Sequence, residues 1–194
     1  MTPRPELILA SASSYKRRLL ERLAIPFTCQ PADIDETPRP GEKPLALAMR
    51  LAREKAAALA SSNPQALVLG CDQVIAAGDQ IFSKPQTSAN AGHQLHQLQG
   101  KTHELINAIH LLGPAGIDES EVVTYSMTMR PLSQKSIESY VAQDQPLDCA
   151  GSYRIESLGI RLFTACQGDD PTAIEGLPLT RVWSLLLRAG WCDE

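Results

Sequence analysis

Several charged side chains interrupt stretches of this 194-residue chain that are otherwise apolar or built from small residues. Lysine and arginine neutralise phosphate oxygens, and clustered carboxylates bind Mg²⁺ or Mn²⁺, which bridge to phosphates. Together these residue types indicate metal-assisted attack of water on a phosphate. The cations are Lys16, Arg17, Lys55 and Lys84, and the carboxylates are Asp35, Glu36 and Asp72.

Lys55 stands on an apolar face of an expected helix over 45–60. Leu47, Leu51 and Leu59 are spaced from it by multiples of four, so a helix places all four side chains on one side. A lysine there either extends its charged end to the surface or faces a negative group. Both a nearby carboxylate and a bound anion are candidates for that negative group.

Asp72 follows a run of apolar residues, and we expect a buried strand over 66–75. In open α/β sheets ligands bind beyond the carboxyl ends of strands, where a carboxylate can act as a base or a metal ligand. The alternative is a structural aspartate that accepts backbone N–H bonds in a turn. Gly70 removes a side chain where a ligand could approach closely.

The stretch LILASASSYKRRLLERL (7–23) changes from an apolar run to hydroxyl residues, then to cations and leucines. Ser13 or Ser14 can cap the helix that follows. Backbone N–H groups at a helix N-terminus, small hydroxyl residues and nearby cations form an anion site.

Other polar residues are unremarkable when each is taken alone. The acidic loop 32–44 is typical of a solvated segment, and Lys84 before Pro85 is typical of a surface lysine whose backbone the proline stiffens. His93 and His96 are three apart, but no third ligand follows at a suitable distance, so we expect helix-surface residues.

Composition indicates a soluble globular protein, with 43% hydrophobic and 21% charged residues. A net charge of −4 does not favour nucleic acid or an anionic membrane as a partner. No apolar run approaches the ~20 residues of a membrane span, and no secretory signal is visible, so we expect a cytosolic protein. Scattered cysteines without a CxxC pair predict free thiols rather than disulfides or zinc: Cys29, Cys71, Cys149, Cys166 and Cys192.

Strands alternate with helices, which predicts an α/β fold with a mixed sheet and flanking helices. We expect one domain over 1–194, or two interleaved lobes within it. The expected strands are 7–10, 25–30, 66–75, 102–112, 121–130 and 158–166, and the further expected helices are 88–100 with Ser88 as its cap, 133–143 and 178–188.

The chain resembles the Maf-type nucleoside triphosphate pyrophosphatases through LILASASSYKRRLLERL, DIDET, RLAREKA, LGCDQV, FSKP, CAGSYRIES and GLPL. These motifs occur in family order and cover nearly the whole chain. The resemblance implies a twisted mixed sheet of the Maf/ITPase-like type with a deep nucleotide-binding cleft. It also implies hydrolysis between the α and β phosphates with a divalent cation, Mg²⁺ or Mn²⁺, and a possible homodimer.

The resemblance also implies roles for individual residues. Asp72 matches the proton acceptor, and Glu36, Lys55 and Lys84 match the polar groups around the phosphates and metal. Glu36 and Asp72 are the implied metal ligands. The phosphate-binding segment matches at Ser11, Ser13, Lys16 and Arg17.

Three positions resemble the branch of the family that acts on 7-methyl-GTP: Tyr15, Gln73 and Glu156. Methylated guanine is cationic and suits an aromatic face, and a carboxylate can accept from guanine N1–H and N2–H. A dTTP or UTP pyrophosphatase of the same family, and a nucleotide-binding regulator of cell division without turnover, remain alternatives.

Two features depart from the family pattern. The family usually has proline before the aromatic position and arginine after it, where this chain has Ser14 and Lys16. Lysine keeps the charge but loses bidentate geometry, for which Arg17 can compensate. Glu175, before GLPL, stands where apolar residues are commoner, and nothing in the sequence explains it.

Overall fold

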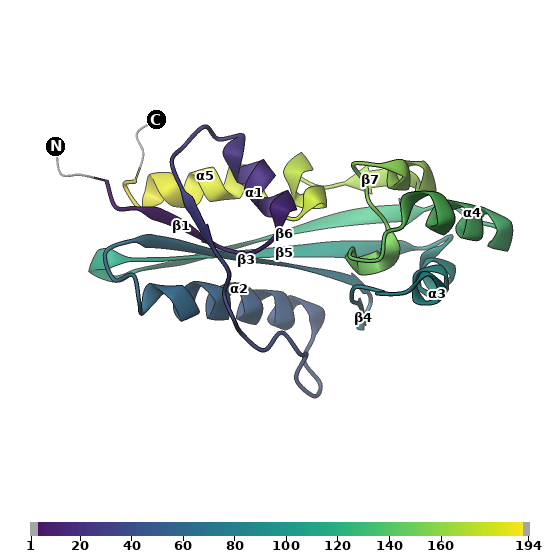
Figure 1. Cartoon of the computed structure of the whole chain (residues 1–194), viewed down its shortest axis with the longest axis horizontal. Helices are drawn as coiled ribbons and strands as arrows, with labels where there is room; N and C mark the ends of the chain where they lie inside the picture. The colour runs from purple at the N-terminus through teal and green to yellow at the C-terminus, as the bar shows by residue number, and fades with distance from the viewer. Residues whose placement is uncertain (1–3, 192–194) are drawn as a thin grey trace. The chain divides into compact units, whose positions relative to one another are not determined.

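The computed structural model describes residues 4–191 and has the expected α/β architecture with a mixed sheet and flanking helices (Figure 1). Its strands are β1 (Leu7–Ala10), β2 (Thr28–Gln30), β3 (Leu67–Ala77), β4 (Gln80–Phe82), β5 (Thr102–Gly113), β6 (Ile117–Met129) and β7 (Phe163–Gln167). Its α-helices are α1 (Ser14–Glu21), α2 (Pro44–Ala60), α3 (Ser88–Leu98), α4 (Gln134–Asp144) and α5 (Leu179–Arg188).

The sheet combines parallel and antiparallel strands in the order β2-β1-β3-β5-β6-β7, with β4 paired to β3. Strand β1 is parallel to both β2 and β3. Strands β4 and β7 run antiparallel to β3 and β6. The prediction of a mixed sheet is therefore confirmed.

The chain divides into two compact units. Among the described residues, unit 1 comprises 4–73, 107–123 and 170–191, and unit 2 comprises 74–106 and 124–169. Strands β3, β5 and β6 contribute residues to both units.

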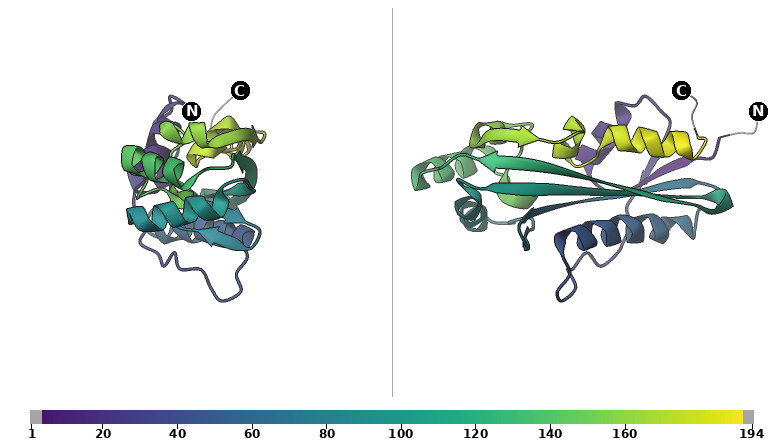
Figure 2. Two further views of the ribbon diagram at one scale, coloured as in Figure 1. Left: turned by 90° about the vertical axis from the view of Figure 1, so that its right-hand side faces the viewer. Right: turned by 180° about the vertical axis from the view of Figure 1, so that it is seen from behind.

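In unit 1, helices cover both faces of β1 and β3. Leu7, Leu9 and Leu69 belong to a buried cluster with residues of α1 and α5. Ile8 and Val68, from the alternate positions, pack with residues of α2. Figures 1 and 2 show α2 on one side of these strands and α1 and α5 on the other. Side chains on a strand alternate between its faces, so apolar residues in succession require this double covering.

Gly70 allows α2 to approach β3 closely. A Cβ at this position would collide with the Ala52 carbonyl oxygen and lie 2.7 Å from the Ala56 backbone nitrogen. The expectation that Gly70 makes room for a ligand is therefore wrong, because the helix backbone fills that space. This close approach places Ala52 and Ala56, on either side of Lys55 in α2, directly against β3.

In unit 2, α3 packs against α4, and an aromatic group lies in the core. The His103 ring lies 5.6 Å from the Tyr153 ring and 5.9 Å from the Phe163 ring, measured between centroids. His103 Nε2 and the Tyr153 hydroxyl are 2.8 Å apart and share a hydrogen bond.

Several element boundaries differ from the sequence prediction; β6, for example, begins at Ile117 rather than at residue 121. The expected strand 158–166 begins later, because Leu158–Leu162 forms a 3-10 helix in which the Gly159 N–H donates to the Arg154 carbonyl. Strand β2 is shorter than 25–30. Thr87, not Ser88, caps α3 through a hydrogen bond from the Asn90 N–H.

Two sequence-based expectations can be compared with the described residues. Between residues 4 and 191, no helix is long and apolar enough to cross a membrane. Cys29, Cys71, Cys149 and Cys166 are free thiols, and Cys192 lies outside the described residues.

Candidate active site

Lys55 joins two carboxylates in unit 1. Its Nζ donates to Asp72 Oδ1 at 2.6 Å and lies 2.8 Å from Glu36 Oε1. The side chains of Lys55 and Asp72 are each 11% exposed, whereas Glu36 is 59% exposed. The lysine on the apolar face of α2 therefore faces a negative group, and Asp72 is not the turn residue of the alternative interpretation.

The carboxylates of Asp72 and Glu36 keep the Lys55 side chain protonated. Burial alone lowers the pKa of a lysine, but the carboxylates of Asp72 and Glu36 outweigh burial, so the pKa of Lys55 lies above its ordinary value. Lys55 is therefore cationic throughout the physiological pH range. The cluster of one ammonium and two carboxylates is referred to below as the Lys55 cluster.

Asp72 lies inside β3, as the expected strand over 66–75 predicts, and β3 continues beyond it to Ala77. The parallel pairing of β1 with β3 ends at Ala10 and Gly70, two residues before Asp72. The carboxylate thus lies just past the carboxyl end of β1. This is the edge where ligands bind in open α/β sheets.

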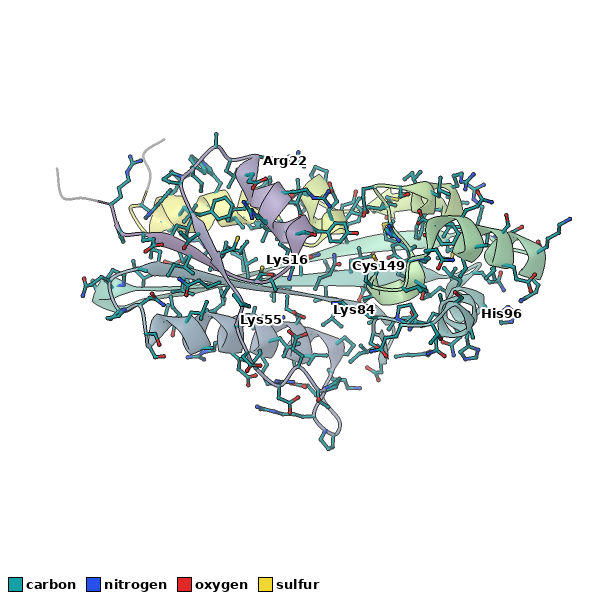
Figure 3. The ribbon with its side chains drawn as sticks, viewed as in Figure 1. Lys16, Arg22, Lys55, Lys84, His96 and Cys149 are labelled. Atoms are coloured by element: carbon teal, nitrogen blue, oxygen red, sulfur yellow. The ribbon has the colours of Figure 1, made fainter. Side chains whose placement is uncertain are left out.

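Lys16 reaches the same segment from the opposite face of β3. Its Nζ donates to the Cys71 carbonyl oxygen at 2.8 Å. Figure 3 shows Lys16 at α1 and Lys55 at α2, with the strands between them. Lys16 and Lys55 thus contact adjacent residues of β3. The partner of Lys16 is a backbone carbonyl, which the sequence does not reveal.

The two serines before α1 shape its N-terminus. Ser13, one of the two predicted candidates, is the N-cap, and its Oγ accepts from the Lys16 N–H at 3.4 Å. Ser11 Oγ accepts from the Ser13 N–H at 3.1 Å. These bonds orient the first turn of α1, where N–H groups can bind an anion.

Arg17 and Tyr15 have other neighbours on α1. The Arg17 guanidinium is exposed and pairs with Glu21 at 3.0 Å. It therefore does not join the Lys55 cluster in this structure. The half-buried Tyr15 ring has the Arg18 guanidinium 5.0 Å from its centroid, so the ring already attracts a cation.

Arg50 holds the loop that carries Glu36, a role that the sequence did not suggest. Its Nε and Nη2 bind the two oxygens of Glu42 at 2.6 and 2.9 Å, and Nη2 also donates to the Thr37 carbonyl at 3.1 Å. The hydrogen bond from Arg50 lowers the pKa of Glu42 to about 2. The spacing of residues in the sequence does not reveal this interaction, which fixes Thr37, the residue next to Glu36.

Gln73 contacts the segment just before the GLPL motif, and Glu175, within that segment, contacts the end of α1. Gln73 Nε2 donates to the Ala173 carbonyl at 2.9 Å. Glu175 Oε1 lies 3.9 Å from Nη1 of Arg22, the residue that follows α1 and is labelled in Figure 3, and both side chains are partly exposed.

Lys84 and Glu156 belong to unit 2, and both are exposed. The backbone on each side of Lys84 is bound by α3, because Gln94 donates to the Ser83 carbonyl and Asn90 donates to the Pro85 carbonyl, each at 3.0 Å. Lys84 also lines a pocket of about 260 Å³. The roles of these two residues stay predictions.

Glu36 and Asp72 have the chemistry of a magnesium or manganese site. Each gives one oxygen to Lys55 and has a second carboxylate oxygen. Mg²⁺ commonly binds through one or two carboxylates together with substrate phosphates and water. The described residues contain no group of three or more His, Cys, Asp and Glu side chains suited to a metal. The two carboxylates fit a cation whose coordination includes phosphate oxygens.

The fold and the Lys55 cluster define an α/β protein in which one buried ammonium pairs with two carboxylates just past the carboxyl end of β1. Residues 6–189 match the family model described as Maf-like protein. The chain belongs to this family.

Curated relatives match over nearly their full lengths. The 7-methyl-GTP pyrophosphatase of Pseudomonas putida is 45% identical over 185 residues, covering 95% of this chain and 96% of the relative. That of Alkalilimnicola ehrlichii is 43% identical over 192 residues, covering 98% and 96%. Among solved structures, the Staphylococcus aureus Ham1 protein matches with a TM-score of 0.47 and 17% identity over 64% of this chain and 71% of that chain. This score is too low for a conclusion about function to rest on it.

Proposed function

We propose that this protein is a nucleotide pyrophosphatase that hydrolyses 7-methyl-GTP to 7-methyl-GMP and pyrophosphate. The observation that carries the proposal is the Lys55 cluster, in which a buried ammonium holds Asp72 and Glu36 together. The names of its relatives support the same substrate. Clearing this modified nucleotide in the cytosol would keep it out of RNA.

Asp72 is the proposed base. One carboxylate oxygen is bound to Lys55, and the other accepts the proton of the attacking water. The water oxygen bonds to phosphorus as the bond from that phosphorus to the bridging oxygen breaks, and pyrophosphate leaves. Lys55 and Lys16 offset the charge that develops on the phosphates, and Lys84 is proposed to add a third cation.

Glu36 and Asp72 would hold Mg²⁺ or Mn²⁺. A bound cation would neutralise phosphate charge and orient the triphosphate. Arg50 contributes by fixing the backbone next to Glu36 through the Thr37 carbonyl. The N-terminus of α1, shaped by Ser13, is proposed to bind phosphate oxygens.

Base selection is assigned to Tyr15, Gln73 and Glu156. The Tyr15 ring suits a cationic base, since it already has a guanidinium at 5.0 Å. Glu156 would accept from guanine N1–H and one N2–H. Uracil offers no such pair of donors.

A substrate panel tests this function. Wild-type protein is given 7-methyl-GTP, GTP, UTP, dTTP and CTP at equal Mg²⁺, and pyrophosphate and phosphate are measured separately. We expect pyrophosphate, with kcat/KM highest for 7-methyl-GTP. Glu156→Gln should lower the preference for 7-methyl-GTP over UTP by about tenfold.

Glu138→Gln, an exposed change in α4 of the same unit, is the matched control and should leave the preference unchanged. A higher kcat/KM for UTP or dTTP would overturn the proposed substrate. Nucleotide binding without any pyrophosphate would instead favour a non-catalytic regulator.

A further inference from the structure

The side-chain amide of Gln73 is held in one orientation. Its Nε2 donates to the Ala173 carbonyl at 2.9 Å and also lies 3.2 Å from Asn107 Oδ1 and 3.4 Å from the Ile174 carbonyl. Backbone carbonyls accept hydrogen bonds and cannot donate them. The nitrogen of Gln73 must therefore face this group, and its oxygen, Oε1, lies on the side of Gly176.

The two backbone carbonyls belong to the 3-10 helix η4 (Pro171–Glu175), which Asp170 holds in place. Asp170 is fully buried, and each of its oxygens accepts two hydrogen bonds. Oδ1 accepts from the Thr172 N–H at 2.8 Å and its hydroxyl at 2.6 Å. Oδ2 accepts from the Thr180 N–H at 2.8 Å and its hydroxyl at 2.6 Å.

These hydrogen bonds keep Asp170 ionised. Burial alone would raise the pKa of Asp170, but the four hydrogen bonds from Thr172 and Thr180 outweigh burial and lower it. A buried carboxylate with all four bonds satisfied is rigid, because losing any one of them leaves an acceptor without a partner.

The hydrogen-bonded group around Asp170 also closes the turn that lies beside Gln73. The Thr172 hydroxyl accepts from the Leu179 N–H at 2.8 Å, so the residues between them form a closed loop. Gly176 within this loop has φ of +102°, and a Cβ there would lie 3.6 Å from Gln73 Oε1 and 3.8 Å from Lys16 Cε. The closed loop therefore lies beside both Gln73 and a proposed phosphate-binding lysine.

We propose that Asp170 is a positioning residue for base recognition. Through Thr172 and Thr180 it fixes η4, and η4 fixes Gln73 so that Oε1 faces the nucleotide as a hydrogen-bond acceptor. The guanine N2 amino group is a hydrogen-bond donor, and Gln73 Oε1 accepts from it. This inference rests on the proposed function for its ligand, and on the structure alone for the orientation of Gln73.

Thr180→Val tests the inference, since it removes one donor to Asp170 and keeps the backbone bond. The first readout is hydrogen exchange of the Gln73 side-chain amide by ¹⁵N NMR, assigned by its loss in Gln73→Met. We expect exchange to accelerate by about threefold or more in Thr180→Val. Thr180→Ser, which keeps the hydroxyl, should restore protection. Ser184→Ala, on the same helix, is the matched control, because its hydroxyl bonds the Thr180 carbonyl and not Asp170.

The second readout is the ratio of kcat/KM for 7-methyl-GTP to that for 7-methyl-ITP, which lacks the N2 amino group. Thr180→Val should lower this ratio by about threefold or more, with Thr180→Ser restoring it. Unchanged amide exchange in Thr180→Val would overturn the positioning role, whichever nucleotide is hydrolysed. If exchange accelerated but wild-type protein did not hydrolyse 7-methyl-GTP, the proposed function would fail while the positioning of Gln73 by Asp170 stood.

Discussion

In unit 1 the buried side chains of Lys55 and Asp72 are charged and in contact, whereas in unit 2 the buried His103 and Tyr153 are neutral and share one hydrogen bond. Burial lowers the pKa of His103 to about 4 and raises that of Tyr153 well above its ordinary value. In unit 1 the carboxylates overcome burial and keep Lys55 cationic. A buried ammonium that keeps its charge beside two carboxylates is a feature expected of a site that acts on charged ligands, whereas His103 and Tyr153 are buried in their neutral forms.

The largest combined effect on turnover and stability is expected from Lys55→Met. The change leaves Asp72 and Glu36 facing each other without a cation, so turnover should fall by about 100-fold or more. Unfolding should become easier by about 3 kcal/mol, because a buried carboxylate loses its partner. Nucleotide turnover and denaturant unfolding measure the two effects.

Arg53→Met, an exposed change on the same helix, is the control and should cost less than about 1 kcal/mol. Adding Asp72→Asn to Lys55→Met should recover part of the lost stability, since the two side chains interact directly. Additive losses in the double variant would show that the pair is not coupled.

An effect on stability alone, and one that depends on pH, is expected from His103→Gln in unit 2. Because the folded pKa of about 4 lies below the ordinary 6.5, the unfolded chain binds a proton first as the pH falls. The stability linked to neutral His103 is complete above pH 6.5 and is lost as the pH falls towards 4, by about 3 kcal/mol in all. Wild-type protein should therefore lose more stability than His103→Gln across this window.

Thermal unfolding between pH 7 and pH 4 measures that difference. His96→Gln, an exposed change on α3 (Figure 3), is the control and should follow the wild-type curve. Parallel curves for wild-type protein and His103→Gln would contradict the view that unit 2 buries this group in its neutral form.

The sequence predicted those parts of the site that depend on local spacing. Intervals of four placed Lys55 on the buried face of α2, and two serines before a run of helix formers predicted a cap at Ser13 or Ser14, of which the structure uses Ser13. The mixed sheet followed from the alternation of strands and helices. Each of these features is set by neighbours within a few residues, which a pattern can record.

The partners of these residues could not be predicted in the same way. Gln73 is held by a carbonyl 100 residues away, and Lys16 by the carbonyl of Cys71. Backbone carbonyls are present at every position, so no residue type marks the one that is used. Asp170 left a weak signal, because aspartate before proline and threonine is typical of a helix start, but its bonds to Thr180 depend on the tertiary fold.

Asp72→Asn tests the central claim most directly. Asparagine keeps the size of the side chain and an oxygen for Lys55, but it cannot take a proton from water. With enzyme in excess over 7-methyl-GTP, pyrophosphate release should slow by about a thousandfold, while the circular dichroism spectrum stays that of the wild type. Release at the wild-type rate would contradict the assignment of Asp72 as the base.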